Sequence, residues 1–372
     1  MTCLAEVQKA RLSKSDHCLW LVVGNDFLPI EPIRGFLVYL DDLERSPHTI
    51  RAYAYHLKLY WDYLETHALD WRHVGLGEMA GFVAWLRRGS RRVVLLEEHE
   101  ATRTESTINA ILSAVYAFRE YHQRTGELVA GSAAVDEHWT FQPNRPYKGF
   151  LYHISKSKPV RTRLVKLKQP RRLPRTLEPA QVELLVQACW HLRDQLLVCL
   201  VYESGLRIGQ ALGLRHEDVR SWDNQVAIVP RHNANGVRAK RCDVHVVDVD
   251  RSVMALYARY LIEEVGELDT DYVFVNLWEG NIGRPMTYNA ALDLFRRLER
   301  RTGIYARPHM LRHSHATDLI RTGKWDLAYV QRRLGHVNIQ TTAKYLHLVA
   351  ADLKAAHQDY LRRRQERDGR DK

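Results

Sequence analysis

Residues 309–320 read HMLRHSHATDLI, and residues 332–347 read RRLGHVNIQTTAKYLH. In the first stretch Arg312 follows His309 by three residues, which on one helix places an imidazole and a guanidinium on the same face. In the second stretch His336 follows a glycine, where it can point into a cleft, and Tyr345 stands nine residues further on. Each residue taken singly is usually an ordinary surface or core residue, but chance rarely supplies the whole spaced set.

Two more basic clusters precede these stretches. Residues 205–219 read GLRIGQALGLRHEDV, and Arg207 falls where one predicted helix ends and the next begins. Residues 225–230 alternate in a β-rich pattern, Asn235-Gly236 is a strong tight-turn signal, and residues 242–247 return as a second strand. The sequence therefore predicts a hairpin that carries a basic group around Lys240.

The chain is basic and long enough for more than one domain. Its 372 residues correspond to about two or three domains. There are 55 Lys and Arg against 44 Asp and Glu, a net charge of +11. The resulting isoelectric point, near 9.4, is typical of proteins that bind nucleic acid. Hydrophobic residues make up 45% of the sequence, which excludes a wholly disordered chain.

Several other classes are disfavoured. No apolar run approaches the length of a membrane span, and residues 1–17 lack the apolar core of a signal peptide. The five cysteines, at positions 3, 18, 189, 199 and 242, form no CxxC pair, so we expect reduced thiols that serve as small core residues. The expected location is the cytoplasm, in association with the nucleoid.

The first half of the chain is predicted to be helical. Ser46-Pro47 supplies an N-cap and a proline suited to the first helical turn, and apolar residues from Ile50 to Leu64 recur on one face. Further helices are expected around residues 79–86 and 108–118, and no strand-rich region is expected here. The second half is predicted to combine helices with the hairpin, so that the fold class is multidomain α and α+β.

A basic linker is predicted to join the two halves. From Lys156 to Arg175 there are nine basic residues and no acidic one, with prolines at 159, 170 and 174. Proline and like-charge repulsion favour an extended chain, which suits a protein that wraps a duplex. If six of these charges met phosphates, log K would fall with log salt at a slope of about −5. The alternative is a solvated linker that binds nothing.

These patterns divide the chain into successive regions. We expect an N-terminal extension at 1–28, a helical domain at 29–150, the basic linker at 151–175, a second domain at 176–366 and a short tail at 367–372.

The spaced set resembles the tyrosine recombinase (phage integrase) family over about residues 175–350. Residues 205–219 are similar to the family's first arginine box, residues 309–320 to its His-x-x-Arg-His box, and residues 332–347 to its Leu-Gly-His segment and nucleophilic tyrosine. Residues 46–64, SPHTIRAYAYHLKLYWDYL, resemble its N-terminal domain more loosely. The resemblance implies a helical, SAM-like core-binding domain followed by a mostly helical catalytic domain with a small antiparallel sheet.

The resemblance also implies DNA cutting and rejoining through a 3′-phosphotyrosyl intermediate. Tyr345 would attack the scissile phosphate, although only about one phenol in a thousand is ionised at neutral pH. Arg207 and Arg312 would hold the non-bridging oxygens, because a guanidinium fork suits that geometry. Lys240, which matches the family's hairpin lysine, would donate a proton to the departing 5′-oxygen.

Histidines complete the implied site. His309 would act as general acid or base, since an imidazole titrates near neutral pH. His336 would hydrogen-bond a phosphate oxygen, and His313 would support the neighbouring arginine. Two arginines and a lysine supply the charge that a metal ion would otherwise supply, so no metal and no other cofactor is expected. Gln210 departs from the glutamate that many family members have there; it keeps a hydrogen bond but not the charge.

The expected partner is double-stranded DNA, on which the protein would assemble as a tetramer, with accessory or sister recombinases as candidate partners. By analogy with the family, a helix at about 350–365 would dock on a neighbouring protomer. Six further residues are candidate DNA contacts: Arg51, Lys58, Lys156, Lys158, Arg161 and Arg163.

The sequence leaves other activities to be weighed against recombination of a mobile element. A type IB topoisomerase would share the chemistry but relax DNA as a monomer. A metal-dependent transposase would need three carboxylates, for which no distinctive spacing is present. A catalytically silent DNA-binding regulator is the non-enzymatic alternative, and it would often lack Tyr345 or one of the arginines.

Overall fold

The computed structural model describes residues 5–11, 18–88, 103–128, 138–140, 160–162, 165–170, 174–237, 243–278, 280–322 and 325–335. The chain divides into two compact units, Met1–Arg171 and Arg172–Lys372, each with its own hydrophobic core. The division falls inside the stretch predicted as the basic linker.

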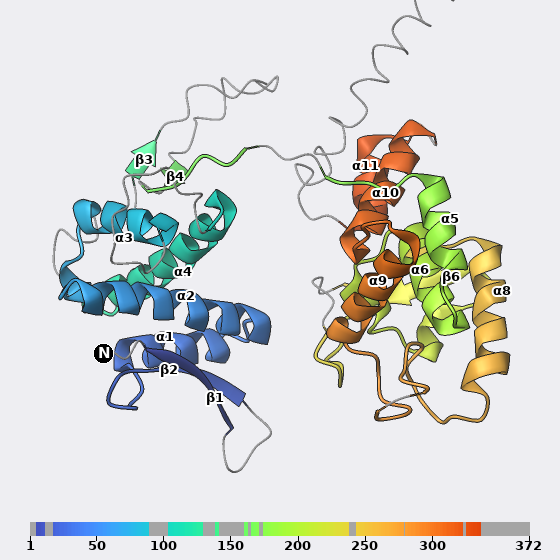
Figure 1. The fold of residues 1–372 in the computed structure, drawn as a ribbon, viewed down its shortest axis with the longest axis horizontal. Coiled ribbons are helices and arrows are strands. Elements are labelled where there is room, and N and C mark those ends of the chain that lie inside the picture. The colour runs from blue at the N-terminus through green and yellow to red at the C-terminus, as the bar shows by residue number, and fades with distance from the viewer. Residues whose placement is uncertain are drawn as a thin grey trace, which may run out of the picture. The chain divides into compact units, whose positions relative to one another are not determined.

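The N-terminal unit is built mainly from four helices (Figure 1). They are α1 (Glu31–Asp42), α2 (Pro47–Thr66), α3 (Leu76–Arg88) and α4 (Glu105–Arg124), with a short 3-10 turn η1 (Trp71–His73) between α2 and α3. Two short strands, β3 (His138–Thr140) and β4 (Val160–Thr162), pair antiparallel.

The apolar face predicted for α2 is the centre of this unit. Ala54, Leu57 and Leu64 are buried, and Tyr60 packs edge-on against Phe82 of α3 with ring centroids 5.3 Å apart. The predicted proline start is also confirmed, because α2 begins at Pro47.

The first half contains short strands, although no strand-rich region was expected there. Strands β1 (Glu6–Arg11) and β2 (Cys18–Val23) form an antiparallel hairpin with Val7 opposite Val22. The hairpin packs on α2: the backbone amide of Ala5 donates to Asp62 Oδ1 at 3.0 Å, and Trp20 lies 6.3 Å from Tyr55, centroid to centroid. The run LWLVV is apolar throughout and lacks the alternation that marks a half-buried strand.

The C-terminal unit surrounds a small sheet with helices. The sheet has the order β5 (Val219–Arg220), β6 (Gln225–Ile228) and β7 (His245–Asp248), all antiparallel, with a short 3-10 turn η3 (His216–Asp218) before it. The helices are α5 (Pro179–Gln187), α6 (Leu192–Ser204), α7 (Ile208–Ala211), α8 (Arg251–Tyr260) with the π-helical turn η4 (Leu261–Val265), α9 (Tyr288–Thr302), α10 (Pro308–Arg321) and α11 (Leu327–Leu334).

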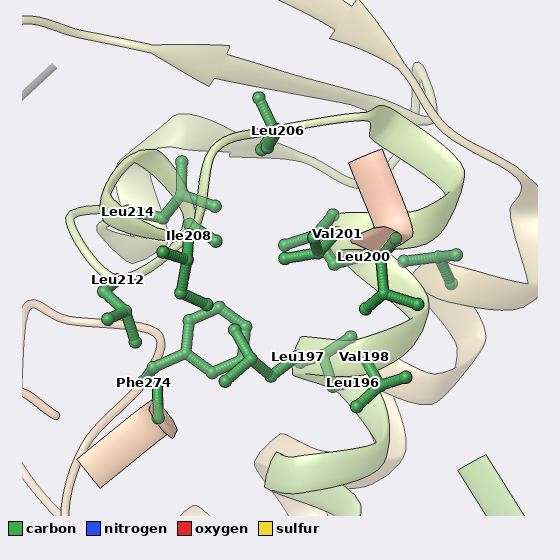
Figure 2. Packing of buried hydrophobic residues seen from close by; sticks show 14 of the residues in the cluster. Leu196, Leu197, Val198, Leu200, Val201, Leu206, Ile208, Leu212, Leu214 and Phe274 are labelled. Atoms are coloured by element: carbon green, nitrogen blue, oxygen red, sulfur yellow. The ribbon is translucent and has the colours of Figure 1, made fainter. Parts of the chain in front are cut away.

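Helix α6 forms the middle of the C-terminal core because it is apolar around most of its circumference. Figure 2 shows Leu197 and Val201 of α6 packed toward Ile208 and Phe274. The sequence located several boundaries correctly, since α9 spans residues 288–302 and Thr287 caps it by accepting from the Ala290 amide at 3.2 Å.

Helix α6 ends at a glycine that the packing requires. Gly205 has a φ of +64°, in the left-handed region that favours glycine. A Cβ at this position would lie 2.6 Å from Cδ2 of His315 and 2.8 Å from Cδ2 of Leu334. The turn therefore needs glycine both for its backbone conformation and for the close approach of α10 and α11.

We expect Gly205→Ala to destabilise the C-terminal unit by about 2–5 kcal/mol, since it combines about 1–2 kcal/mol of left-handed strain with overpacking of about 1–3 kcal/mol. Gly303→Ala is the matched control: Gly303 ends α9 at a φ of +70°, but a Cβ there meets nothing within 4 Å. Urea unfolding of both full-length variants measures the difference. Equal losses in the two variants would contradict the close-packing argument.

Candidate active site

Arg207 lies at the turn between α6 and α7, where the sequence predicted it. It is the N-cap residue of α7 and is half-buried. Its backbone amide donates to Oε1 of the buried Gln210 at 2.9 Å. Gln210 therefore supplies a hydrogen bond that fixes the backbone of the arginine, which is one function that the family's glutamate could serve at this position.

Arg312 lies in α10 and is turned into the protein, with 3% of its surface exposed. Its Nη1 donates to the carbonyl oxygen of Gly205 at 2.5 Å, and its Nη2 donates to the carbonyl oxygen of Leu334 at 2.7 Å. Gly205 stands two residues before Arg207, and Leu334 stands two residues before His336. The guanidinium of Arg312 thus joins the segments that carry all three sequence boxes.

His309 and His313 lie one turn apart on α10, with ring centroids 6.4 Å apart and an angle of 28° between the ring planes. His309 is exposed near the start of the helix, and His313 is half-buried. The two rings therefore stack along the helix, while Arg312 between them points inward. An exposed imidazole on the helix that carries Arg312 can exchange protons with a bound anion.

Three of the predicted catalytic residues, Lys240, His336 and Tyr345, lie outside the described residues, as does the predicted helix at 350–365. Their flanking segments are described. Strand β7 begins five residues after Lys240, and α11 ends at Leu334, with Gly335 as its left-handed C-cap at a φ of +61°. The glycine break predicted before His336 is therefore confirmed.

Two groups beside this arrangement, the half-buried Arg333 and the buried His315, were not predicted from the sequence. Arg333 Nε donates to Nε2 of His315 at 3.0 Å, so His315 accepts at that nitrogen and is neutral. Burial, and then the nearby charges of Arg333 and Arg312, lower the pKa of His315 to about 3. The sequence shows Arg333 as a basic residue before Leu334 and His315 as a third histidine in residues 309–320. A linear pattern does not show that these two side chains are in contact.

The predicted DNA contacts of the N-terminal unit have different surroundings. Arg51 is exposed, with its guanidinium carbon 5.2 Å from the centre of the Trp20 ring and 5.7 Å from that of Tyr55. Lys58 pairs with the buried carboxylate of Asp62 at 2.6 Å, so a phosphate would have to compete with that pair. Lys156, Lys158 and Arg163 lie outside the described residues, and Arg161 belongs to β4.

The cysteines of the C-terminal core match their predicted use as small core residues. Cys189 is buried and Cys199 half-buried, and both are free thiols. Burial raises the pKa of Cys189 to about 12 and that of Cys199 to about 11, so neither is a ready nucleophile. In the part of the chain that the structure describes, no helix is both long and apolar enough to span a membrane.

Comparison with known proteins agrees with this architecture. Residues 175–351 match the family model described as "Phage integrase family", and residues 33–126 match "Phage integrase, N-terminal SAM-like domain". Transposase A from transposon Tn554 of Staphylococcus aureus is 40% identical over 364 residues, which cover 97% of this chain and 99% of that protein. Tyrosine recombinase XerD of Ralstonia nicotianae is 33% identical over 216 residues, which cover 55% of this chain and 66% of that protein.

Solved structures share the fold at low sequence identity. The Tn1549 transposon integrase in complex with transposon right end DNA is 16% identical with a TM-score of 0.59, over 89% of this chain and 99% of that one. The XerH site-specific recombinase bound to its difH substrate is 19% identical with a TM-score of 0.57, over 84% of this chain and 79% of that one. The fold predicted from the sequence is confirmed.

His315 should make the C-terminal unit acid-sensitive. The folded imidazole has a pKa of about 3, below the ordinary value of 6.5 that applies in the unfolded chain. Between these values the unfolded chain binds a proton that the folded unit excludes. The free energy of unfolding should therefore fall as the pH drops from 6.5 toward 3, by up to about 1.4 kcal/mol per pH unit from this group.

Urea unfolding between pH 7 and pH 4 measures the effect. We expect His315→Gln to lose stability less steeply with acid than the unsubstituted protein, whereas His232→Gln, which removes an exposed histidine, should keep the original steepness. The same acid slope in His315→Gln and the unsubstituted protein would show that His315 carries no such proton linkage.

Proposed function

The chain belongs to the phage integrase family of tyrosine recombinases, and from this premise we propose that it cuts and rejoins DNA at specific sites to move a mobile element. The observation that carries the proposal is the guanidinium of Arg312, which joins the turn before Arg207 to the helix end before His336. The near full-length similarity to a transposase favours transposition or integration over relaxation of DNA by a topoisomerase.

The arginines supply the positive charge of the reaction. Arg207 and Arg312 hold the non-bridging oxygens of the scissile phosphate and stabilise the additional negative charge of the transition state. The bonds from Arg312 to Gly205 and Leu334 use two of the five N–H donors of its guanidinium. The Arg207 turn is fixed by the Gln210 hydrogen bond and by the bond from Arg312 to Gly205, so little reorganisation accompanies substrate binding. Such preorganised donors typically contribute about 10²–10³-fold in rate each.

Tyr345, Lys240 and the histidines perform the bond chemistry. The Tyr345 phenol attacks phosphorus and forms a 3′-phosphotyrosyl ester, while Lys240 protonates the 5′-oxygen that leaves. His309, exposed at the start of α10, acts as general acid or base, and His336 hydrogen-bonds a phosphate oxygen. The ester retains the energy of the phosphodiester, so the reverse attack by a 5′-hydroxyl reseals the strand without a nucleotide cofactor.

We also propose that four copies assemble on DNA. Exchange between two duplexes breaks four strands. Each break uses one tyrosine, so a complete reaction needs four active sites. The basic segment from Lys156 to Arg175, together with Arg51, would hold the duplex by its phosphates. The DNA sequences that flank its own gene are the natural first substrates.

Covalent trapping tests the chemistry. The protein is incubated in EDTA with nicked duplexes taken from the DNA that flanks its gene, and the products are separated on a denaturing gel. We expect an SDS-resistant, protease-sensitive adduct that is absent with Tyr345→Phe. With Arg207→Gln its rate of formation should fall by about 10²–10³-fold.

Arg220→Gln is the matched control, because Arg220 is an exposed arginine of the same unit outside the proposed site. It should trap DNA at the rate of the unsubstituted protein. An adduct that persists in Tyr345→Phe, or cleavage that requires a divalent metal, would contradict the proposed chemistry. The mass of the complex on paired sites reports the number of protomers, for which we expect four.

A further inference from the structure

The side chain of Arg333, the residue before the Leu-Gly-His sequence, forms hydrogen bonds with three other segments of the C-terminal unit. Its Nη2 donates to the carbonyl oxygens of Glu203 at 3.0 Å and Asp248 at 2.9 Å, and its Nε donates to His315. One side chain thus bridges the end of α6, the end of β7 and the middle of α10.

The backbone of Arg333 makes a fourth link. Its carbonyl oxygen accepts a hydrogen bond from Nε2 of His245, at 2.9 Å. His245 and Asp248 are the first and last residues of β7. The end of α11 is therefore fastened to both ends of this strand, once through the backbone and once through the guanidinium.

The surroundings of the Arg333 guanidinium favour a fixed set of hydrogen bonds. Arg333 is half-buried, and burial lowers its pKa, while the charges of Asp248 and Glu203 oppose that shift. A guanidinium keeps its charge in proteins, and its planar fork holds several acceptors in a set geometry. A lysine could not reach the same acceptors with a rigid fork.

The strand and the helix that Arg333 joins lead directly to two residues of the proposed mechanism. Lys240 lies five residues before His245 along the chain, and His336 lies three residues after Arg333. The contacts of Arg333 therefore join the two described segments from which the chain runs to Lys240 and to His336. We propose that Arg333, with His245, is a positioning residue that aligns Lys240 for proton transfer to the leaving oxygen; this inference rests on the proposed function.

A substrate with a different leaving group tests whether Arg333 positions the proton donor or acts in another way. In a duplex whose scissile phosphate carries sulfur at the 5′-bridging position, the tyrosine oxygen bonds to phosphorus, the phosphorus–sulfur bond breaks and sulfur keeps the electron pair. The thiolate needs no proton to leave, because thiols are far more acidic than alcohols. A defect confined to proton donation should disappear on this substrate.

The full-length variants compared are Arg333→Gln, His245→Phe, Lys240→Met as the reference for a missing donor, and Arg332→Gln as the matched control. Arg332 is the exposed neighbour on the same helix, so its substitution removes the same charge without these contacts. Single-turnover adduct formation is measured at saturating DNA on the oxygen and sulfur substrates, and thermal unfolding confirms that each variant is folded.

On the oxygen substrate we expect Arg333→Gln to react at least about tenfold more slowly than the unsubstituted protein, with a smaller loss in His245→Phe and none in Arg332→Gln. On the sulfur substrate Arg333→Gln and His245→Phe should recover to within about threefold, as Lys240→Met should. If Arg333→Gln does not fold, the recovery of His245→Phe decides the question.

A loss in Arg333→Gln that is equal on both substrates, or no loss on the oxygen substrate, would overturn the positioning role. The reference variant separates this failure from that of the proposed function. If Lys240→Met is not restored by sulfur, the assignment of Lys240 as proton donor is wrong, whatever Arg333 does.

Discussion

The buried guanidinium of Arg312 is the group on which the geometry of the C-terminal unit depends. A charge removed from water is costly unless hydrogen bonds replace its hydration. Here the carbonyl oxygens of Gly205 and Leu334, at the ends of α6 and α11, supply those bonds. Helix C-termini carry unpaired carbonyls and partial negative charge, so both helix ends are stabilised by the same cation. Arg312 thus determines where two helices stop relative to α10.

The other residues of the candidate site follow from these helix ends. Glycine at each end, Gly205 and Gly335, lets the chain turn in the left-handed conformation. Arg207 then starts α7, and the chain continues from α11 toward His336 and Tyr345. His309 is exposed at the start of α10, the helix that carries Arg312. The site is therefore assembled from the termini of packed helices, which places charged groups at the edge of a rigid core.

The sequence predicted the parts of this arrangement that local patterns determine. The limits of α9, the Pro47 start of α2, the β6–β7 hairpin and the glycine break before His336 all follow from capping, turn and periodicity signals. The hairpin of β1 and β2 was missed because its apolar run does not alternate. The contacts of Arg333 with His315 and Asp248 were missed because they join residues 18 and 85 positions apart, and no local pattern encodes such a meeting.

Identification of the residue that carries DNA in the trapped adduct shows whether Tyr345 is the nucleophile. The adduct is digested with protease and nuclease, and the nucleotide-bearing peptide is sequenced by tandem mass spectrometry. If Tyr345 is the nucleophile, the peptide carries a 3′-linked nucleotide on the phenolic oxygen of Tyr345. A nucleotide on another side chain, for example the exposed Tyr329 of α11, would contradict the assignment of Tyr345 as the nucleophile.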